Sequence, residues 1–148
     1  MSCIEAHRIV HHDLALRNVL LAQSQPIQVK VTDFGQAIQL KSPQAVSREA
    51  NDEAELAWRW MAPEAIFHRV FTSASDVWAF GVTTWEVLNH GEMPYEDLCN
   101  TAVAYRVLGG DRLPQRDCPD TLWRLIDRQC WISNPRYRAT FAQRPLFL

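Results

Sequence analysis

The segment formed by residues 76–89 constrains the fold more than any other part of the chain. Its hydrophobic side chains do not keep to one helical face: Val77, Trp78, Phe80, Val82, Trp85, Val87 and Leu88. A helix that is apolar all round is normally buried among other elements. We expect Ser75 or Asp76 to cap this helix and Gly91 to end it. The segment therefore predicts a helical domain built around a buried central helix.

The rest of the chain predicts a mainly α fold with one small β-hairpin. The pattern favours the end of a helix at 1–9, a hairpin from strands 19–21 and 27–32, a long loop at 36–55, helices at 63–68, 101–108 and 120–131, and a last helix that begins at Arg138 and is interrupted by Pro145.

Composition excludes several classes of protein. The chain has 148 residues, 47% of them hydrophobic, and a net charge of −2, which gives no reason to expect a nucleic-acid partner. Its longest apolar stretch, residues 77–85, is far shorter than the ~18 residues of a spanning helix. The four cysteines show no paired spacing, so we expect reduced, mostly buried thiols.

A short polar loop, residues 11–18, brings together a carboxylate, a cation and an amide. Asp13 could accept a proton, Arg17 could neutralise an anion, and Asn18 could supply a hard oxygen to Mg²⁺. Taken alone, this loop is equally compatible with a polar segment that has no function.

Two further motifs follow along the chain. Asp33-Phe34-Gly35 comes after the strand-like residues 29–31, where an Asp can hold a metal while a glycine lets the backbone turn sharply. Ala62-Pro63-Glu64 closes the polar stretch that begins at Gln36. A tripeptide of the first kind is common by chance, but its spacing after an Asp-x-x-x-x-Asn loop is not.

In this order, H-x-D-L-x-x-x-N, D-F-G and A-P-E resemble the signature set of the protein kinase family. The segment from Asp76 to Gly81 and the set Cys130, Trp131, Pro135 and Arg138 are similar to later elements of that family. The resemblance covers residues 4–141. It implies the C-terminal lobe of an α+β kinase fold, with the catalytic loop at 10–21, the DFG motif at 33–35, the activation segment at 33–64 and a helical subdomain at 63–148.

The resemblance also implies a role for each matching residue. Asp13 matches the catalytic base, assisted by Arg17, and Asn18 and Asp33 match the two Mg²⁺ ligands. The remaining matches are Leu20, Phe34 and Gly35 around ATP, His11 stacked with Phe34, Asp76 as acceptor for the catalytic-loop backbone, and Glu64 with Arg138 as a buried ion pair.

The substrate class that the resemblance implies is tyrosine. Ala15 stands where serine/threonine kinases usually carry a lysine, and a cation appears instead at Arg17. The run from Trp58 to Glu64 is similar to the W-x-A-P-E segment of tyrosine kinases. Trp60 and Met61 are therefore expected to form part of the substrate platform, although Trp58 and Trp60 could also be core aromatics.

The function implied is transfer of the ATP γ-phosphoryl group to tyrosine in proteins, with ATP and Mg²⁺ as cofactors, protein substrates as partners and a cytoplasmic location. If the parent protein is a receptor, that location is the intracellular side of the membrane. Residues 1–148 contain no Gly-rich loop and no V-A-I-K strand, so we expect the N-terminal lobe to be absent and the isolated chain to be inactive.

Two departures from the family keep a second interpretation open. His12 stands where most kinases carry an arginine, and residues 36–61 hold no tyrosine or threonine, only Ser42 and Ser47. His12 and the missing lobe leave open a pseudokinase-like interaction module. Retention of Asp13, Asn18 and Asp33 favours an enzyme, one that does not use a phosphotyrosine switch in this segment.

Overall fold

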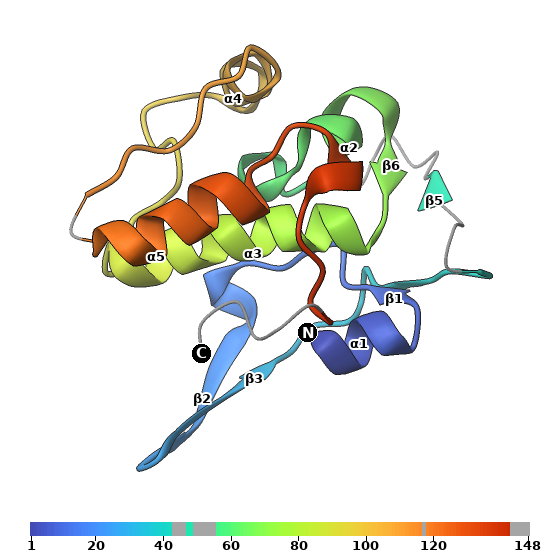
Figure 1. The fold of residues 1–148 in the computed structure, drawn as a ribbon, viewed down its shortest axis with the longest axis vertical. Helices are drawn as coiled ribbons and strands as arrows, with labels where there is room; N and C mark the ends of the chain where they lie inside the picture. The colour runs from blue at the N-terminus through green and yellow to red at the C-terminus, as the bar shows by residue number, and fades with distance from the viewer. Residues whose placement is uncertain (43–46, 49–55, 117, 143–148) are drawn as a thin grey trace.

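A computed structural model describes residues 1–42, 47–48, 56–116 and 118–142. Helices surround one long central helix, and three small two-stranded sheets lie at the periphery (Figure 1). The elements are α1 (Ser2–Ala6), β1 (Ile9–Val10), η1 (Leu16–Asn18), β2 (Val19–Ser24), β3 (Ile27–Val31), β4 (Ile38–Gln39), β5 (Ser47–Arg48), η2 (Trp58–Trp60), α2 (Pro63–His68), β6 (Val70–Phe71), α3 (Ser73–Leu88), α4 (Asn100–Leu108), α5 (Asp120–Leu125), η3 (Ile126–Cys130) and η4 (Pro135–Tyr137).

The central helix is α3, and its burial confirms the prediction made from its pattern. Trp78 and Trp85 are only 2% and 3% exposed, and Phe80 is half-buried against the core. The turn η3 packs along α3, and the approach is close because Gly81 has no side chain. A Cβ at that position would lie 2.7 Å from Nε1 of Trp131.

The cap of α3 differs from the expectation. Thr72, not Ser75 or Asp76, is the N-cap: its hydroxyl accepts a hydrogen bond from the Ala74 N–H at 3.2 Å. Ser75 is the third helical residue and accepts from the Thr72 N–H in return, which makes a capping box. Asp76 is instead turned toward the polar loop. The helix ends as expected, with Gly91 at φ +84° donating to the Glu86 carbonyl.

The sheets are small, and two of them were not expected. The hairpin β2–β3 is present, with Val19 opposite Val31, and it projects away from the helices (Figure 1). The stretch predicted as one long loop contains β4, which pairs with β1, and β5, which pairs with β6. Strands of two residues carry no periodic pattern, so the sequence could not indicate them.

Three other expectations are corrected by the structure. The predicted helix at 120–131 is the helix α5 followed by the π-helical turn η3. No helix begins at Arg138, whose backbone is extended (φ −72°, ψ 145°) directly after η4. Only Cys130 is buried, whereas Cys3 and Cys99 are exposed and Cys118 is half-exposed; all four are free thiols.

Within the described part of the chain, no helix has both the length and the apolar character required to cross a membrane.

Candidate functional site

The hairpin β2–β3 brings the polar loop next to Asp33. The ladder continues past Val19 and Val31, because the Thr32 N–H and hydroxyl both donate to the Asn18 carbonyl, at 2.9 and 3.1 Å. Asn18 and Asp33 therefore lie at the same end of the hairpin. Asp33 has a left-handed backbone at φ +61°, a conformation that Asp tolerates better than most residues.

Asp13 is held by two neighbours on the polar loop. Arg17 forms an ion pair with its Oδ1, and the Asn18 side-chain amide donates to its Oδ2 at 2.9 Å. The same amide donates to the Asp13 backbone carbonyl at 2.7 Å. Each carboxylate oxygen thus has a donor, and the side chain is oriented before any ligand arrives.

Asp76, on the central helix α3, fixes the backbone of the polar loop. Its two carboxylate oxygens accept from the backbone N–H groups of His11 and His12, at 2.7 and 3.1 Å. These bonds hold His12 at φ +73°, which is uncommon for a residue other than glycine. Burial raises the pKa of the Asp76 carboxyl to about 7, although the two N–H donors oppose that shift.

His11 is fully buried and joins the polar loop to the segment around Asp33. Its Nε2 lies 3.0 Å from the Thr32 carbonyl, and its Nδ1 lies 3.3 Å from the Asp13 N–H. Both contacts are satisfied when Nε2 carries the proton and Nδ1 accepts. The ring also packs 4.9 Å from the ring of Phe34, which is the stack that the sequence predicts.

Glu64 and Arg138 form the predicted ion pair. The guanidinium nitrogens donate to the two carboxylate oxygens at 2.7 and 3.0 Å, and both residues are buried. Arg138 also donates to the carbonyls of Ala74, Ile132 and Ser133. The pair therefore ties the start of α2 to the segment after η3.

Trp60 and Met61 are core residues rather than exposed ones. Their side chains are only 8% and 7% exposed, so a substrate platform here cannot rest on display of these two side chains. Trp60 nevertheless touches the polar loop, because the Arg17 guanidinium lies over its ring at 4.6 Å. Trp60 therefore supports the loop by this contact, and Met61 is part of the core.

Glu86 is a residue of this region that the sequence analysis missed. It is buried on α3, and its Oε2 accepts from the Leu16 backbone N–H at 3.0 Å and from the Trp60 indole N–H at 2.7 Å. Burial raises the pKa of its carboxyl, while the two donors and the charge of Arg17 oppose the shift. An acidic residue in the second half of a helix predicted to be buried was the signal that could have identified it.

The residues present fit a magnesium ion of the kind that binds phosphates. Asn18 and Asp33 offer hard oxygens, and Mg²⁺ typically takes one or two protein ligands together with water and phosphate oxygens. The side-chain amide nitrogen of Asn18 donates to Asp13. The side-chain oxygen of Asn18 is therefore the atom that can face a cation. Among the described residues there is no cluster of three His, Cys, Asp or Glu side chains that could hold a metal alone.

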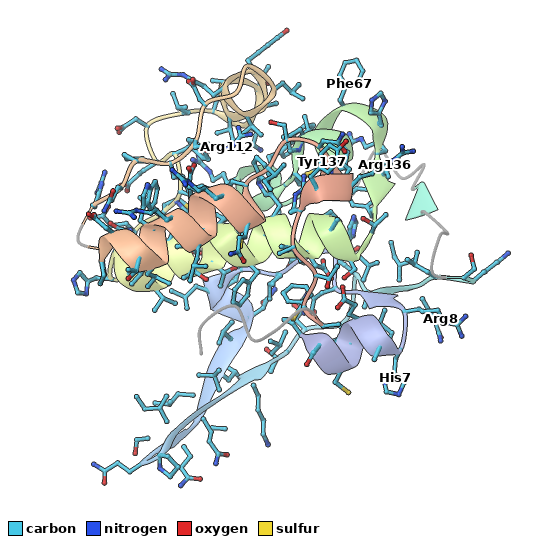
Figure 2. The ribbon with its side chains drawn as sticks, in the orientation of Figure 1. His7, Arg8, Phe67, Arg112, Arg136 and Tyr137 are labelled. Atoms are coloured by element: carbon cyan, nitrogen blue, oxygen red, sulfur yellow. The ribbon has the colours of Figure 1, made fainter. Side chains whose placement is uncertain are left out.

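Leu20 and Phe34 are exposed, at 56% and 45%, next to the ends of the hairpin. A cleft of about 1090 Å³ lies elsewhere, between α1 and η4. Arg8 and Arg136, labelled in Figure 2, line it, and so do Glu64 and Arg138, but Asp13, Asn18 and Asp33 do not. This cleft is therefore not the place where the predicted catalytic and metal-binding residues gather.

His12 and the part of the segment after Gly35 that the structure describes contact neighbouring residues. The His12 ring meets the edge of Phe71 at 3.9 Å between ring centroids. Ser42 is half-buried, and the preceding Lys41 carbonyl accepts a hydrogen bond from Arg8 at 3.2 Å. The side chain of Ser47 lies outside the described part of the chain.

Comparison with known proteins gives the family. The chain matches the family "Protein tyrosine and serine/threonine kinase" over residues 1–145. It is 41% identical to mouse "Ephrin type-A receptor 1" over 97% of this chain, and 42% identical to mouse "Proto-oncogene tyrosine-protein kinase ROS" over 93%. It is also 41% identical, over 93% of its length, to "Tyrosine-protein kinase transforming protein ros" of UR2 avian sarcoma virus.

The chain spans only 14%, 6% and 35% of the lengths of these three relatives. Each match nevertheless covers nearly all of the present chain, and an identity of 41–42% is high enough to establish that the proteins are related. The chain belongs to the protein tyrosine and serine/threonine kinase family and is of the tyrosine-kinase-like type.

Proposed function

We propose that the domain to which residues 1–148 belong transfers the γ-phosphoryl group of Mg-ATP to tyrosine hydroxyls in proteins. The observation that carries this proposal is the preorganised Asp13 carboxylate, which has a donor on each oxygen and lies on the same loop as Asn18. The backbone carbonyl of Asn18 in turn accepts from Thr32, the residue before Asp33. The names of two relatives, each a tyrosine-protein kinase, support the choice of tyrosine.

In this mechanism, Asp13 accepts the proton of the tyrosine hydroxyl while the phenol oxygen bonds to the γ-phosphorus. The bond from that phosphorus to the bridging oxygen breaks, and ADP leaves. Asn18 and Asp33 would hold magnesium, which would supply charge that stabilises the phosphate oxygens. Arg17 and the Asn18 amide keep the Asp13 carboxylate oriented during the proton transfer.

Leu20 and Phe34 extend the proposal to the nucleotide. Their exposed apolar side chains lie toward the end of the hairpin that carries Asn18 and Asp33, and we assign Leu20 to the floor beneath the adenine ring. Gly35 follows Asp33 and donates its N–H to the Asp33 carboxylate at 3.3 Å, which orients that ligand. ATP as the phosphoryl donor favours an activity in the cytoplasm, on the intracellular side of the membrane if the parent protein is a receptor.

The test uses the longest natural product that contains residues 1–148, with tyrosine and serine versions of one peptide as acceptors. We expect labelling of the tyrosine peptide, reduced about 10²–10⁴-fold in Asp13→Asn because general-base catalysis is worth about that much. The 148-residue chain alone should bind Mg-ATP weakly and transfer nothing. A folded wild-type product that transfers to neither peptide would overturn the proposal and favour an interaction module.

A further inference from the structure

Half-buried apolar side chains line the cleft between α1 and η4, which has no part in the site proposed for catalysis. The cleft has a volume of about 1090 Å³, and neither Asp13 nor Asp33 lines it. Five of its lining residues are apolar and half-buried, and they come from three parts of the chain: Ile9, Val70, Ala74, Pro135 and Ala139. A hollow with apolar walls that are open to water is typical of a binding site.

The two acidic residues of this cleft are already paired with donors of the protein. Glu5 accepts from the Ser73 hydroxyl at 2.6 Å through Oε1 and from the Ala142 N–H at 2.8 Å through Oε2. Glu64 accepts from the guanidinium of Arg138 through both oxygens. A basic ligand would have to displace one of these donors, so the cleft is poorly suited to bind a cation.

Two arginines of the cleft, in contrast, carry positive charge that is not neutralised. Arg8 lies on the α1 side and Arg136 lies on the η4 side, and both are exposed (Figure 2). Arg8 donates to the Lys41 carbonyl at 3.2 Å, and within the described residues neither guanidinium has an acidic partner. The cleft therefore presents apolar walls between two separate cations.

This arrangement favours one class of ligand over three others. A single inorganic anion has no use for apolar walls, and a fatty acid has one charge where the cleft offers two cations on different elements. Nucleic acid is bound through many phosphate contacts, and two arginines supply few of them. A peptide in which acidic residues flank apolar ones matches both the charge and the walls.

We infer that the cleft between α1 and η4 binds an acidic peptide segment of a protein partner. The apolar side chains of that segment pack against Ile9, Val70 and Ala139, and its carboxylates on either side pair with Arg8 and Arg136. Bidentate pairing of guanidinium with carboxylate fixes the position of the segment along the cleft. This interaction goes beyond the proposed function, because it does not depend on phosphoryl transfer.

Binding is tested on the 148-residue chain by fluorescence anisotropy of a labelled peptide, Asp-Glu-Leu-Ile-Val-Glu-Asp. Two control peptides separate the contributions: in one, lysines replace the acidic residues, and in the other, serines replace the apolar residues. We expect each control peptide to bind at least about tenfold more weakly, because one loses the charge match and the other loses the apolar contact.

Variants of the chain place the peptide in this cleft. Arg8→Gln and Arg136→Gln should each weaken binding about two- to fivefold, the range for an exposed ion pair. Ala139→Phe, which fills the apolar part of the cleft and leaves both arginines in place, should weaken it at least about tenfold. Arg128→Gln is the matched control, because Arg128 is exposed and does not line the cleft, and it should have no effect.

¹H–¹⁵N NMR with the unlabelled peptide gives an independent location. The amides of Ile9, Val70 and Ala139 should shift, and those of Asn18 and Asp33 should not. Asp13→Asn should bind the peptide as the wild type does, so that a failure of the inference and a failure of the proposed function can be told apart.

Three outcomes would overturn the inference. One is equal binding of the lysine peptide, and the second is unchanged binding in the Arg8→Gln/Arg136→Gln double variant. The third is a cleft that takes up laurate, shown by the same amide shifts, but not the acidic peptide, since the ligand would then be a fatty acid.

Discussion

The buried ion pair between Glu64 and Arg138 permits a prediction about stability: the loss of the arginine and the loss of the glutamate charge should lower the free energy of unfolding by different amounts. Arg138 makes two bonds to the Glu64 carboxylate, at 2.7 and 3.0 Å, and further bonds to three backbone carbonyls. Its guanidinium also lies 5.2 Å from the centre of the Trp78 ring. The arginine therefore satisfies more buried groups than the glutamate does.

Removal of the arginine should cost more than neutralisation of the glutamate. Arg138→Met leaves a buried carboxylate and up to three carbonyls without their donor, so we expect a loss of about 4–5 kcal/mol, the upper part of the range for breaking a buried pair. Glu64→Gln keeps the shape, and the guanidinium keeps its carbonyl partners, so we expect about 2–3 kcal/mol.

The assay is urea unfolding followed by the fluorescence of the six tryptophans, at low temperature because a domain has only about 5–15 kcal/mol to lose. The double variant should be less destabilised than the sum of the singles by about 1–3 kcal/mol, since a neutral Gln no longer leaves a buried charge. Arg106→Met is the control: its ion pair with Asp111 is exposed and should be worth about 0–1 kcal/mol.

Two results would refute this reasoning. If Arg138→Met cost no more than Glu64→Gln, the carbonyl bonds of the guanidinium would not contribute as argued. If both single variants cost less than about 1 kcal/mol, the pair would behave as an exposed one.

Four further predictions follow from other parts of the structure. Because burial raises the pKa of Asp76 to about 7, against about 3.9 in an unfolded chain, its contribution to the free energy of unfolding should fall as pH rises from about 4 through about 7. Asp76→Asn should abolish that slope in urea titrations at several pH values, and it should cost about 1–3 kcal/mol at pH 5 because its NH₂ group faces a backbone N–H. Gly81→Ala should destabilise by about 1–3 kcal/mol in the same assay despite the better helix propensity of Ala, because the new Cβ would lie 2.7 Å from Trp131 Nε1 and 2.8 Å from Cys130 Cβ; a more stable variant would contradict the close packing described here. Burial raises the pKa of the Cys130 thiol to about 12, so Cys130 should react with a thiol reagent only after unfolding, whereas Cys3 and Cys99 should react in the native chain, as mass spectrometry of labelled peptides can check. The longest natural product should keep its activity after treatment with tyrosine phosphatase and in the Ser42→Ala/Ser47→Ala variant, since residues 36–61 hold no tyrosine; a collapse of activity that maps to this segment would show that the idea is wrong.

Patterns that depend on many residues at once were readable from the sequence. Apolar residues on all faces of the segment that contains Trp78 and Trp85 predicted the buried helix. The β-branched and leucine runs on either side of Pro26 predicted the hairpin. Ordered motifs predicted that Glu64 and Arg138 would meet although 74 positions separate them. In each case the signal was spread over a segment or was specific enough to name both partners.

Features set by a single tertiary contact were not readable. Thr72 rather than Ser75 caps α3. Both hydroxyls take part in one capping box, and the sequence does not indicate which of the two residues has the non-helical backbone of the N-cap. Arg138 begins no helix: its backbone is extended, and its side chain reaches Glu64 and nearby carbonyls, partners that no local pattern indicates. The role of Glu86 depends on Leu16 and Trp60, and no local pattern links these positions.

Two buried carboxylates of α3 show why a loop can hold a defined geometry in this fold. Asp76, near the N-terminus of the helix, accepts from the backbone N–H groups of His11 and His12, and Glu86, near the C-terminus, accepts from that of Leu16. The two anchors lie on one rigid helix, and Asp13 lies between the backbone positions that they hold. The backbone on both sides of Asp13 is therefore held from the helical side of the molecule, and a ligand that approaches from the hairpin side would meet the proposed base with its backbone already in place.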